Sequence, residues 1–345
     1  MFPMYYNGCN EFNDVVRLDQ VRIFLPKKYR RAHLRFCSGG YVIMLNILIN
    51  AGCYIAIIIL GIVLRRIGFF KESDFSVLSK IVVKVTLPAA LIVNAATREL
   101  APRMLTLSLL GLGGGIIYIA SSWFISRRAS KEQQAFDILN HAGYNIGVFV
   151  IPFTQAFLGT AGVMTASIFD VGNAFVCLGG AYGVAAAVKD GRGFDFKRVV
   201  KALSVSVPFL VHIGTLVLNL LHISIPAAVV NCAGIIANAN AFLAMLMIGV
   251  GFKLELEKAK LSRVFRALAV RYGIALILSL CYWFLLPFDR IVRLTLVILA
   301  VSPIGSAVPG FTEELKGDVG LSCSINSLTI LISIIIIVTL LLFLL

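Results

Sequence analysis

The stretch HAGYNIGVFVIPFTQAFLG, residues 141–159, decides how the rest of the chain is interpreted. It lies inside an apolar run that is long enough to cross a bilayer. Yet it holds His141, Gly143, Asn145, Gly147 and Pro152. Glycine tolerates non-helical backbone and proline deletes a helical hydrogen bond, so these residues predict a membrane helix that is interrupted at mid-depth.

The composition of the whole chain is that of a polytopic membrane protein. Of its 345 residues, 59% are hydrophobic and only 14% are charged, and the mean hydropathy is +0.93. A soluble chain would carry about 25% charged residues. The net charge of +14 does not indicate a nucleic-acid partner, because the basic residues cluster in the short segments between apolar runs.

The seven cysteines are scattered, without a CxxC pair and without a histidine at ligand spacing. We therefore expect no disulfide framework, no metal site and no other cofactor.

Windows of about twenty residues predict an all-α chain with ten membrane-spanning helices. The predicted spans are 44–64, 78–97, 104–126, 136–158, 162–188, 199–221, 226–251, 264–286, 291–312 and 319–345.

Positive charges predict the orientation of these spans. The connections after the odd-numbered spans, together with Lys201 and Arg266 at the starts of the spans that follow, hold 17 lysines and arginines. Those after the even-numbered spans, together with Arg293, hold four. We expect an integral membrane protein with cytoplasmic odd-numbered loops and both termini outside. Residues 1–43 oppose this orientation with seven more positive charges. We interpret them as a basic extension, either disordered or misassigned upstream of a natural start at Met44.

An internal repeat relates the two halves of the chain. At an offset of 158 residues, the segment from Asn145 to Gly162 aligns with the segment from Pro303 to Gly320, with seven identities in eighteen positions. Five spans in each half give the two halves opposite orientations in the membrane. Inverted repeats with interrupted helices at corresponding positions are typical of secondary transporters, and the interruptions indicate the substrate site.

We therefore expect the fourth and ninth spans to unwind and cross at mid-depth. Unwound backbone persists in a membrane only where protein or a water-filled cavity covers it. The half-helix amino termini there, each carrying roughly +0.5 of a charge, favour an anionic ligand. A plain kink is the preferred interpretation for Pro152 and Pro309. The predicted substrate-binding residues are Gly143, Tyr144, Asn145, Gly147, Asn173, Ser302, Pro303, Gly305 and Ser306.

These motifs resemble those of the auxin efflux carrier family, which includes bacterial dicarboxylate permeases and plant PIN carriers. The run GYNIGVFVIP, followed by FLGTAG and ASIFDVGN, resembles the first interrupted helix of the family, and LAVSPIGSA resembles the second. Two departures are Tyr144, where the family often has Gly or Pro, and the missing Met before Pro303. Tyr144 would narrow the site or stack on an aromatic substrate.

The resemblance covers residues 44–345 and implies a fold and a location. It implies two inverted five-helix repeats, residues 44–188 and 189–345. Spans 1, 2, 6 and 7 would form a scaffold, and spans 3–5 and 8–10 a transport unit that moves like an elevator. It also implies a homodimer through the scaffold helices and a bacterial inner (plasma) membrane.

Two roles are open to Asp170, a central charge in span 5: it binds a proton during transport, or it pairs with a neighbouring helix. Asn173 shares its helix face. His141 is a second candidate for proton coupling, although a hydrogen bond to a loop at the cytoplasmic mouth is the preferred interpretation.

The leading hypothesis is a secondary transporter of a small organic anion, a carboxylate or an auxin-like molecule, with the proton as candidate coupling ion. The alternative is a cation/proton antiporter of similar design. That alternative is less favoured, because such exchangers commonly use adjacent carboxylates and Asp170 is followed by Val171. An enzyme is not expected, since the motifs of intramembrane proteases and of nucleotide-driven pumps do not occur in the sequence.

Overall fold

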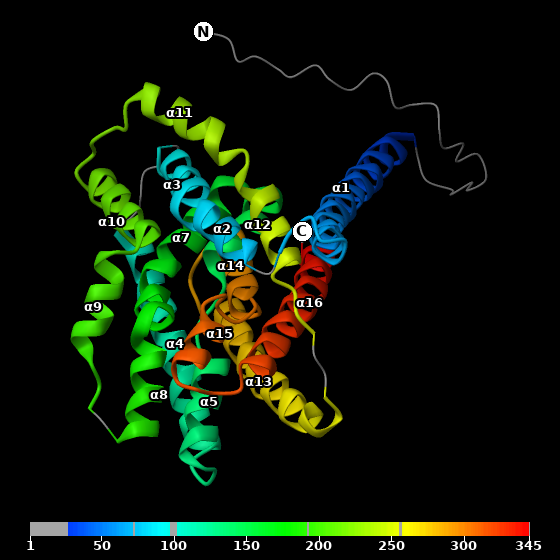
Figure 1. Cartoon of the computed structure of the whole chain (residues 1–345). Coiled ribbons are helices and arrows are strands. Elements are labelled where there is room, and N and C mark those ends of the chain that lie inside the picture. The colour runs from blue at the N-terminus through cyan, green and yellow to red at the C-terminus, as the bar shows by residue number, and fades with distance from the viewer. Residues whose placement is uncertain (1–26, 72, 97–101, 192, 255–256, 345) are drawn as a thin grey trace. The chain divides into compact units, whose positions relative to one another are not determined.

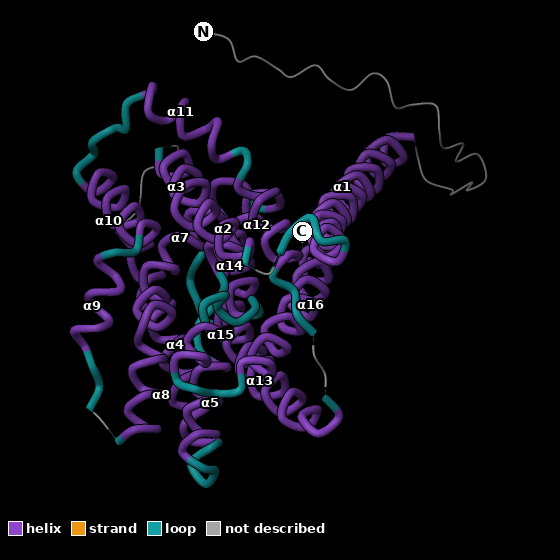
Figure 2. Tube along the Cα trace, viewed as in Figure 1, coloured by secondary structure: helices purple, strands orange, loops and turns teal. Residues whose placement is uncertain are grey.

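The structure is a computed structural model that describes residues 27–71, 73–96, 102–191, 193–254 and 257–344. All of these residues lie in helices, turns or loops, so the all-α prediction is confirmed for the part of the chain that the structure describes (Figure 2). The chain divides into two units, Met1–Asn46 and Ile47–Leu345, and the packing and the sites described below belong to the second unit.

The first part of the chain contains helices α1 to α8 (Figure 1). Their bounds are α1 (Lys27–Arg66), α2 (Asp74–Ile81), α3 (Leu87–Ala95), α4 (Thr106–Ile125), α5 (Lys131–His141), α6 (Ile151–Phe157), α7 (Gly159–Phe175) and α8 (Ala181–Asp190). Short turns join some of them: the π-helical turns η1 (Val82–Thr86), η3 (Ile146–Val150) and η4 (Val176–Gly180), and the 3-10 turn η2 (Pro102–Leu105).

The second part of the chain contains helices α9 to α16. Their bounds are α9 (Phe196–Ser204), α10 (Val207–Leu220), α11 (Ala227–Ala237), α12 (Asn240–Val250), α13 (Leu261–Phe284), α14 (Arg290–Ala300), α15 (Val308–Glu314) and α16 (Val319–Leu344), and the 3-10 turn η5 (Lys258–Lys260) precedes α13.

The expected basic extension falls partly outside this description. Residues 1–26 lie outside the described residues, and α1 begins at Lys27, within the predicted extension. The natural start at Met44 stays a prediction.

Seven helical segments are long and apolar enough to cross a membrane, and the pair α9 and α10, bent by 74°, makes eight if it is counted as one span. The seven are Ile47–Arg66, Asp74–Ala95, Thr106–Ile125, Gly159–Asp190, Ala227–Val250, Lys258–Phe284 and Val319–Leu344. Each lies within a few residues of a predicted span. The protein is therefore an integral membrane protein.

The two predicted spans that are missing from this group are the interrupted ones. Residues 136–158 are divided between α5 and the continuous helical segment η3–α6, and residues 291–312 are divided between α14 and α15. Each piece is too short to cross a bilayer alone, because about twenty helical residues are needed.

Close packing fixes the helix that carries Asp170 and Asn173. Helix α7 packs on α4 at backbone contact: a Cβ added at Gly172 would lie 1.8 Å from the carbonyl oxygen of Ser108, and one at Gly111 would lie 2.1 Å from that of Phe169. Only glycine allows this approach, because any side chain would push the helices apart. The polar face of α7 is thereby held at one depth relative to α4.

Two groups of helices surround the interruptions. Helix α3 packs on α10 and α11, and α12 packs on α2. In the other group, α4 packs on α7 and α5, while α13 packs on α14 and α16. One large apolar core, which includes Phe149, Ile151 and Phe169, runs through both groups.

Candidate functional site

The first break separates α5 from η3 and spans residues 142–145. Gly143 there has a φ of +77°, a left-handed conformation that glycine adopts without strain. The next residue is held through its backbone: Tyr144 N donates to Asn173 Oδ1, and Asn173 Nδ2 donates to Tyr144 O, both at 3.2 Å. The side chain of Asn173 on α7 thus replaces the helical hydrogen bonds that the break removes.

The second break separates α14 from α15 and spans residues 301–307. Here α16 supplies the partners, since Ser333 Oγ donates to Val301 O at 2.6 Å and Ile304 N donates to Thr329 Oγ1 at 3.4 Å. Pro309 lies in the first turn of α15, where a missing N–H costs nothing because that turn has no intrahelical acceptor for it.

The two breaks contact each other. Asn145 N donates to Pro303 O at 3.0 Å, and Asn145 Nδ2 donates to Ser306 Oγ at 2.8 Å. Asn145 is buried, with 4% of its surface exposed. Asn145 and Pro303 are 158 positions apart, which is the offset of the sequence repeat, and Ser306 lies three residues further along. Positions that align in the repeat therefore contact each other in the structure.

A buried arginine on α13 joins both breaks, and the sequence analysis missed it. Arg271 Nη1 donates to His141 O at 2.6 Å, and Arg271 Nη2 donates to Ser302 O at 2.7 Å and to Pro303 O at 3.1 Å. Its guanidinium also stacks on Tyr118, 4.8 Å from the ring centroid. Inserting an arginine at the centre of a membrane helix costs about 2.5–3.5 kcal/mol, which these contacts offset.

A cavity of about 170 Å³ opens beside the breaks. A single water needs only about 10–15 Å³ on the same measure, so the cavity has room for a small solute. Seven of the eleven predicted site residues line it: Tyr144, Asn145, Gly147, Asp170, Asn173, Gly305 and Ser306. The opposite wall comes from Val83, Leu87, Ser206, Pro208, Phe209 and His212, in the group of helices that contains α3 and α10.

Asp170 faces this cavity with a neutral partner. Asn173 Nδ2 donates to Asp170 Oδ1 at 2.8 Å, within α7. Among the described residues no lysine or arginine forms an ion pair with Asp170. The static charge pair that the sequence left open therefore has no support in the described part of the chain.

Tyr144 lines the cavity, but its ring packs inside the protein. Only 2% of the residue is exposed. The ring makes edge contacts with Tyr118 and Phe169, with centroids 5.6 and 5.4 Å apart. In this conformation Tyr144 supports α4 and α7.

The remaining four predicted residues lie next to the cavity and do not line it. They are His141, Gly143, Ser302 and Pro303. His141 is 1% exposed, and its Nδ1 lies 2.9 Å from Ser122 Oγ of α4, so its partner is a buried helix and not the expected loop. These residues shape the breaks.

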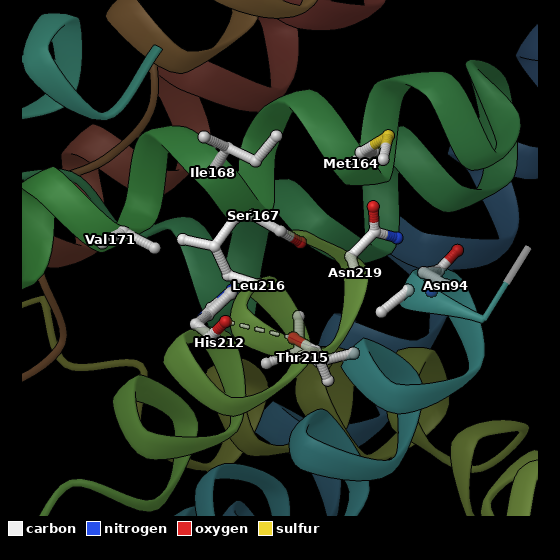
Figure 3. Close-up of a pocket in the computed structure, with 11 residues that line it drawn as sticks. Asn94, Met164, Ser167, Ile168, Val171, His212, Thr215, Leu216 and Asn219 are labelled. Carbon is white, nitrogen blue, oxygen red and sulfur yellow. Dashed lines mark hydrogen bonds between the residues drawn. The ribbon is translucent and has the colours of Figure 1, made fainter. Parts of the chain in front are cut away.

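A second, smaller cavity of about 40 Å³ lies between α3, α7 and α10 (Figure 3). His212 lines both cavities, and its Nε2 and Ser167 Oγ are buried without a hydrogen-bond partner. Thr215 Oγ1 donates a hydrogen bond to the carbonyl oxygen of His212 at 3.1 Å, drawn as a dashed line in Figure 3. Asn94 and Asn219, near the ends of α3 and α10, complete the polar lining.

Sequence reasoning missed Arg271, Cys177 and His212 for different reasons. Arg271 is a central charge in the predicted span 264–286 and could have been found by the test that selected Asp170. Cys177 resembles the other scattered cysteines, although its Sγ donates to Asn173 Oδ1 at 3.1 Å. His212 has no motif around it, and only packing shows that it reaches both cavities.

Comparison with known proteins adds one match. Residues 54–189 match the family model described as membrane transport protein. The matched range contains the first break, Asn145 and Asp170, and it ends before α9. A search of curated proteins found no match.

Proposed function

We propose that this chain, which belongs through residues 54–189 to the membrane transport protein family, is a secondary active carrier of a small organic anion. The observation that carries the proposal is the contact between two interrupted helices, Asn145 to Pro303, at the edge of a cavity. Interrupted helices that meet at mid-depth bind substrate in many secondary transporters. The backbone at the start of η3, including Gly147, faces the cavity and favours negative charge.

The architecture that we propose has ten spans in two inverted repeats. It consists of the seven single spans, the bent pair α9 and α10, and the two interrupted spans. Support comes from the sequence offset of 158 residues. Along the chain, this offset approximately aligns α4 with α13, α5 with α14 and α7 with α16. The hydrogen bond between Asn145 and Pro303 fits a two-fold axis through the breaks, because residues on such an axis meet their own equivalents.

The proposed mechanism is an elevator-like movement. Spans 3–5 and 8–10, which carry both breaks, would move against a scaffold of spans 1, 2, 6 and 7. The cavity supports this division, because its walls come from both groups of helices. The orientation with both termini outside, the bacterial inner membrane and a homodimer through the scaffold belong to the same proposal.

The proposed substrate is a carboxylate or an auxin-like anion, and a proton is the candidate coupling ion. Asp170 is the stronger candidate for the proton, since it lines the cavity and His141 does not. A cation/proton antiporter is less supported, because Asp170 is the only carboxylate among the lining residues.

The experiment that tests the carrier is uptake by proteoliposomes. Asn145→Ala removes the side-chain amide that joins the first break to Ser306 of the second, so we expect uptake to fall about tenfold or more while the protein stays folded. Asn231→Ala, on the exposed face of α11, is the matched control and should transport normally. Full activity of Asn145→Ala would remove Asn145 from the site.

A thermal-shift screen against carboxylates at two pH values would identify the substrate, because a ligand of the folded state raises its apparent stability. Uncharged amides of the same shape are the matched negative probes.

Proton coupling has its own test. Asp170→Asn cannot take up a proton, so we expect the pH dependence of uptake to become flat. An unchanged pH profile would leave Asp170 with a structural role through Asn173.

A further inference from the structure

The side chain of Arg271 carries a buried positive charge whose partners are backbone carbonyls. Arg271 is 1% exposed, and among the described residues no carboxylate forms an ion pair with it. Its three acceptors are the carbonyl oxygens of His141, Ser302 and Pro303. A membrane protein does not bury an arginine without a counter-charge unless something else at the site takes that role.

The acceptors lie at, or just beyond, the carboxyl-terminal ends of two half-helices. His141 is the last residue of α5, and Ser302 and Pro303 follow Ala300, the last residue of α14. The final carbonyls of a helix have no intrahelical donor and carry a partial negative charge. In carriers with interrupted helices, such unwound carbonyls and half-helix ends are where coupling cations bind. Arg271 occupies that position here.

The magnitudes of the charges favour one outcome. Each helix end carries roughly −0.5 of a charge, so the two ends together roughly balance the single positive charge of one guanidinium. With Arg271 in place, the carbonyl side of the breaks is approximately neutral. The N–H groups at the start of η3–α6, which line the cavity through Ile146, Gly147 and Val148, then have no negative helix end to oppose them. Asp170, the one carboxylate among the lining residues, adds no negative charge when it holds the proton that the proposed function assigns to it.

We propose that Arg271 is a tethered cation that takes the place of a coupling cation at the two helix breaks. Transport then needs no sodium ion, and the cavity selects anions over neutral and cationic molecules. The inference rests on the proposed carrier function. It adds the sign of the substrate's charge and the independence of transport from metal cations. Arginine suits this role because its planar fork reaches carbonyls of both breaks at once, whereas an ammonium is a single point charge.

Removal of the side chain tests the role of the charge. In proteoliposomes we would measure uptake of labelled benzoate, malonate and indole-3-acetate in sodium, potassium and choline media of equal ionic strength. The wild type should give the same rate within about twofold in all three media. Arg271→Ala should lose about tenfold or more, because two helix ends lose their cation. About 10 mM guanidinium should restore part of that rate by entering the vacated space.

Arg290→Ala is the matched control. Arg290 also donates to a helix-terminal carbonyl, that of Leu344 at 2.8 Å, but it is exposed and lies at the start of α14, at the opposite end of that helix from the second break. Guanidinium should not change uptake by this variant. Arg271→Lys, which keeps the charge, should retain uptake without sodium and bind the anion more weakly than the wild type.

Thermal melting in detergent tests the cation site without a substrate. The melting temperature of Arg271→Ala should rise with guanidinium, and those of the wild type and Arg290→Ala should not. If Arg271→Ala does not fold, Arg271→Lys provides the uptake readout, and sodium-dependent uptake by it would overturn the proposal.

The outcomes separate this inference from the carrier itself. Sodium-dependent uptake by the wild type, or uptake by Arg271→Ala within about twofold of the wild type, would overturn the tethered cation and leave the carrier standing. Absence of uptake of every anion by the wild type would reject the carrier. A melting temperature of Arg271→Ala that does not respond to guanidinium would overturn the cation role in either case.

Discussion

The two helix breaks occupy aligned positions in the sequence, yet different side chains hold them. The first break, residues 142–145, is held by Asn173 of α7 through the backbone of Tyr144. The second, residues 301–307, is held by two hydroxyl groups of α16. Arg271 contacts both, and the residue 158 positions before it is Gly113.

This difference shows that a repeat can preserve backbone geometry while its polar support diverges. Unpaired N–H and C=O groups in a membrane need partners, but any side chain with the right donor or acceptor can supply them. The first break concentrates its support in one amide, and the second distributes it. The first should therefore be the more sensitive to a single substitution.

The largest effect is expected at Asn173. Asn173→Leu leaves the N–H of Tyr144 without this acceptor and its C=O with only the weak thiol donor of Cys177 at 3.5 Å, and an unsatisfied buried group costs about 1–3 kcal/mol. We expect a loss of about 3 kcal/mol or more in stability, measured by thermal melting in detergent, together with loss of uptake.

Thr329→Val is the matched change in the second break. It removes the long hydrogen bond from Ile304 N, at 3.4 Å, and a local one from Thr329 Oγ1 to Asn326 O within α16. Only the first supports the break, so we expect a loss of about 1 kcal/mol in stability. Equal losses in the two variants would contradict the idea that support is concentrated in the first break.

An intermediate effect is expected from the glycines. Gly143→Ala places a side chain at a φ of +77°, with its Cβ 2.5 Å from Cys177 Sγ. This change should lower the stability of the folded protein, measured by thermal melting, by about 1–2 kcal/mol or more. Gly305→Ala in the second break meets Cys177 Sγ at 3.6 Å, an ordinary contact, and should leave the melting temperature nearly unchanged. If both variants melt like the wild type, the backbone of the first break is not strained by a side chain.

The smallest effect is expected at Asp318, just before α16. Burial by itself raises the pKa of Asp318, but the N–H of Leu321 and the charges of Lys260 and Arg263 outweigh it and lower the pKa below its ordinary value. The carboxylate therefore stabilises the fold above the unfolded-state pKa of about 4, and this contribution is lost as the pH falls through the lower folded-state pKa.

Asp318→Asn removes that contribution, so the melting temperatures of wild type and variant should converge as the pH falls below about 4. At neutral pH the free energies of unfolding of the two proteins should differ by less than about 1 kcal/mol, because the carboxylate is partly exposed. A difference that persists unchanged at low pH would show that the charge of Asp318 does not hold the start of α16.

The positions of the helices and of their breaks follow from the sequence alone. Each described membrane helix lies within a few residues of a predicted span, and the breaks begin beside His141 and Ala300. Hydropathy and helix breakers are local properties, because each apolar run must be covered by lipid or protein wherever it lies. The offset of 158 residues also indicated which two breaks correspond.

Only the tertiary structure decided which side chains support the breaks and which face the cavity. Asn145 and Ser306 line the cavity, whereas His141 and Ser302 are turned into the protein, although all four are polar residues of the same two segments. Arg271 reaches both breaks from a third helix. It lies 130 residues after His141 and 32 residues before Pro303 along the chain. The physical reason is that a side chain's partners depend on how helices distant in sequence pack, and hydropathy does not record that packing.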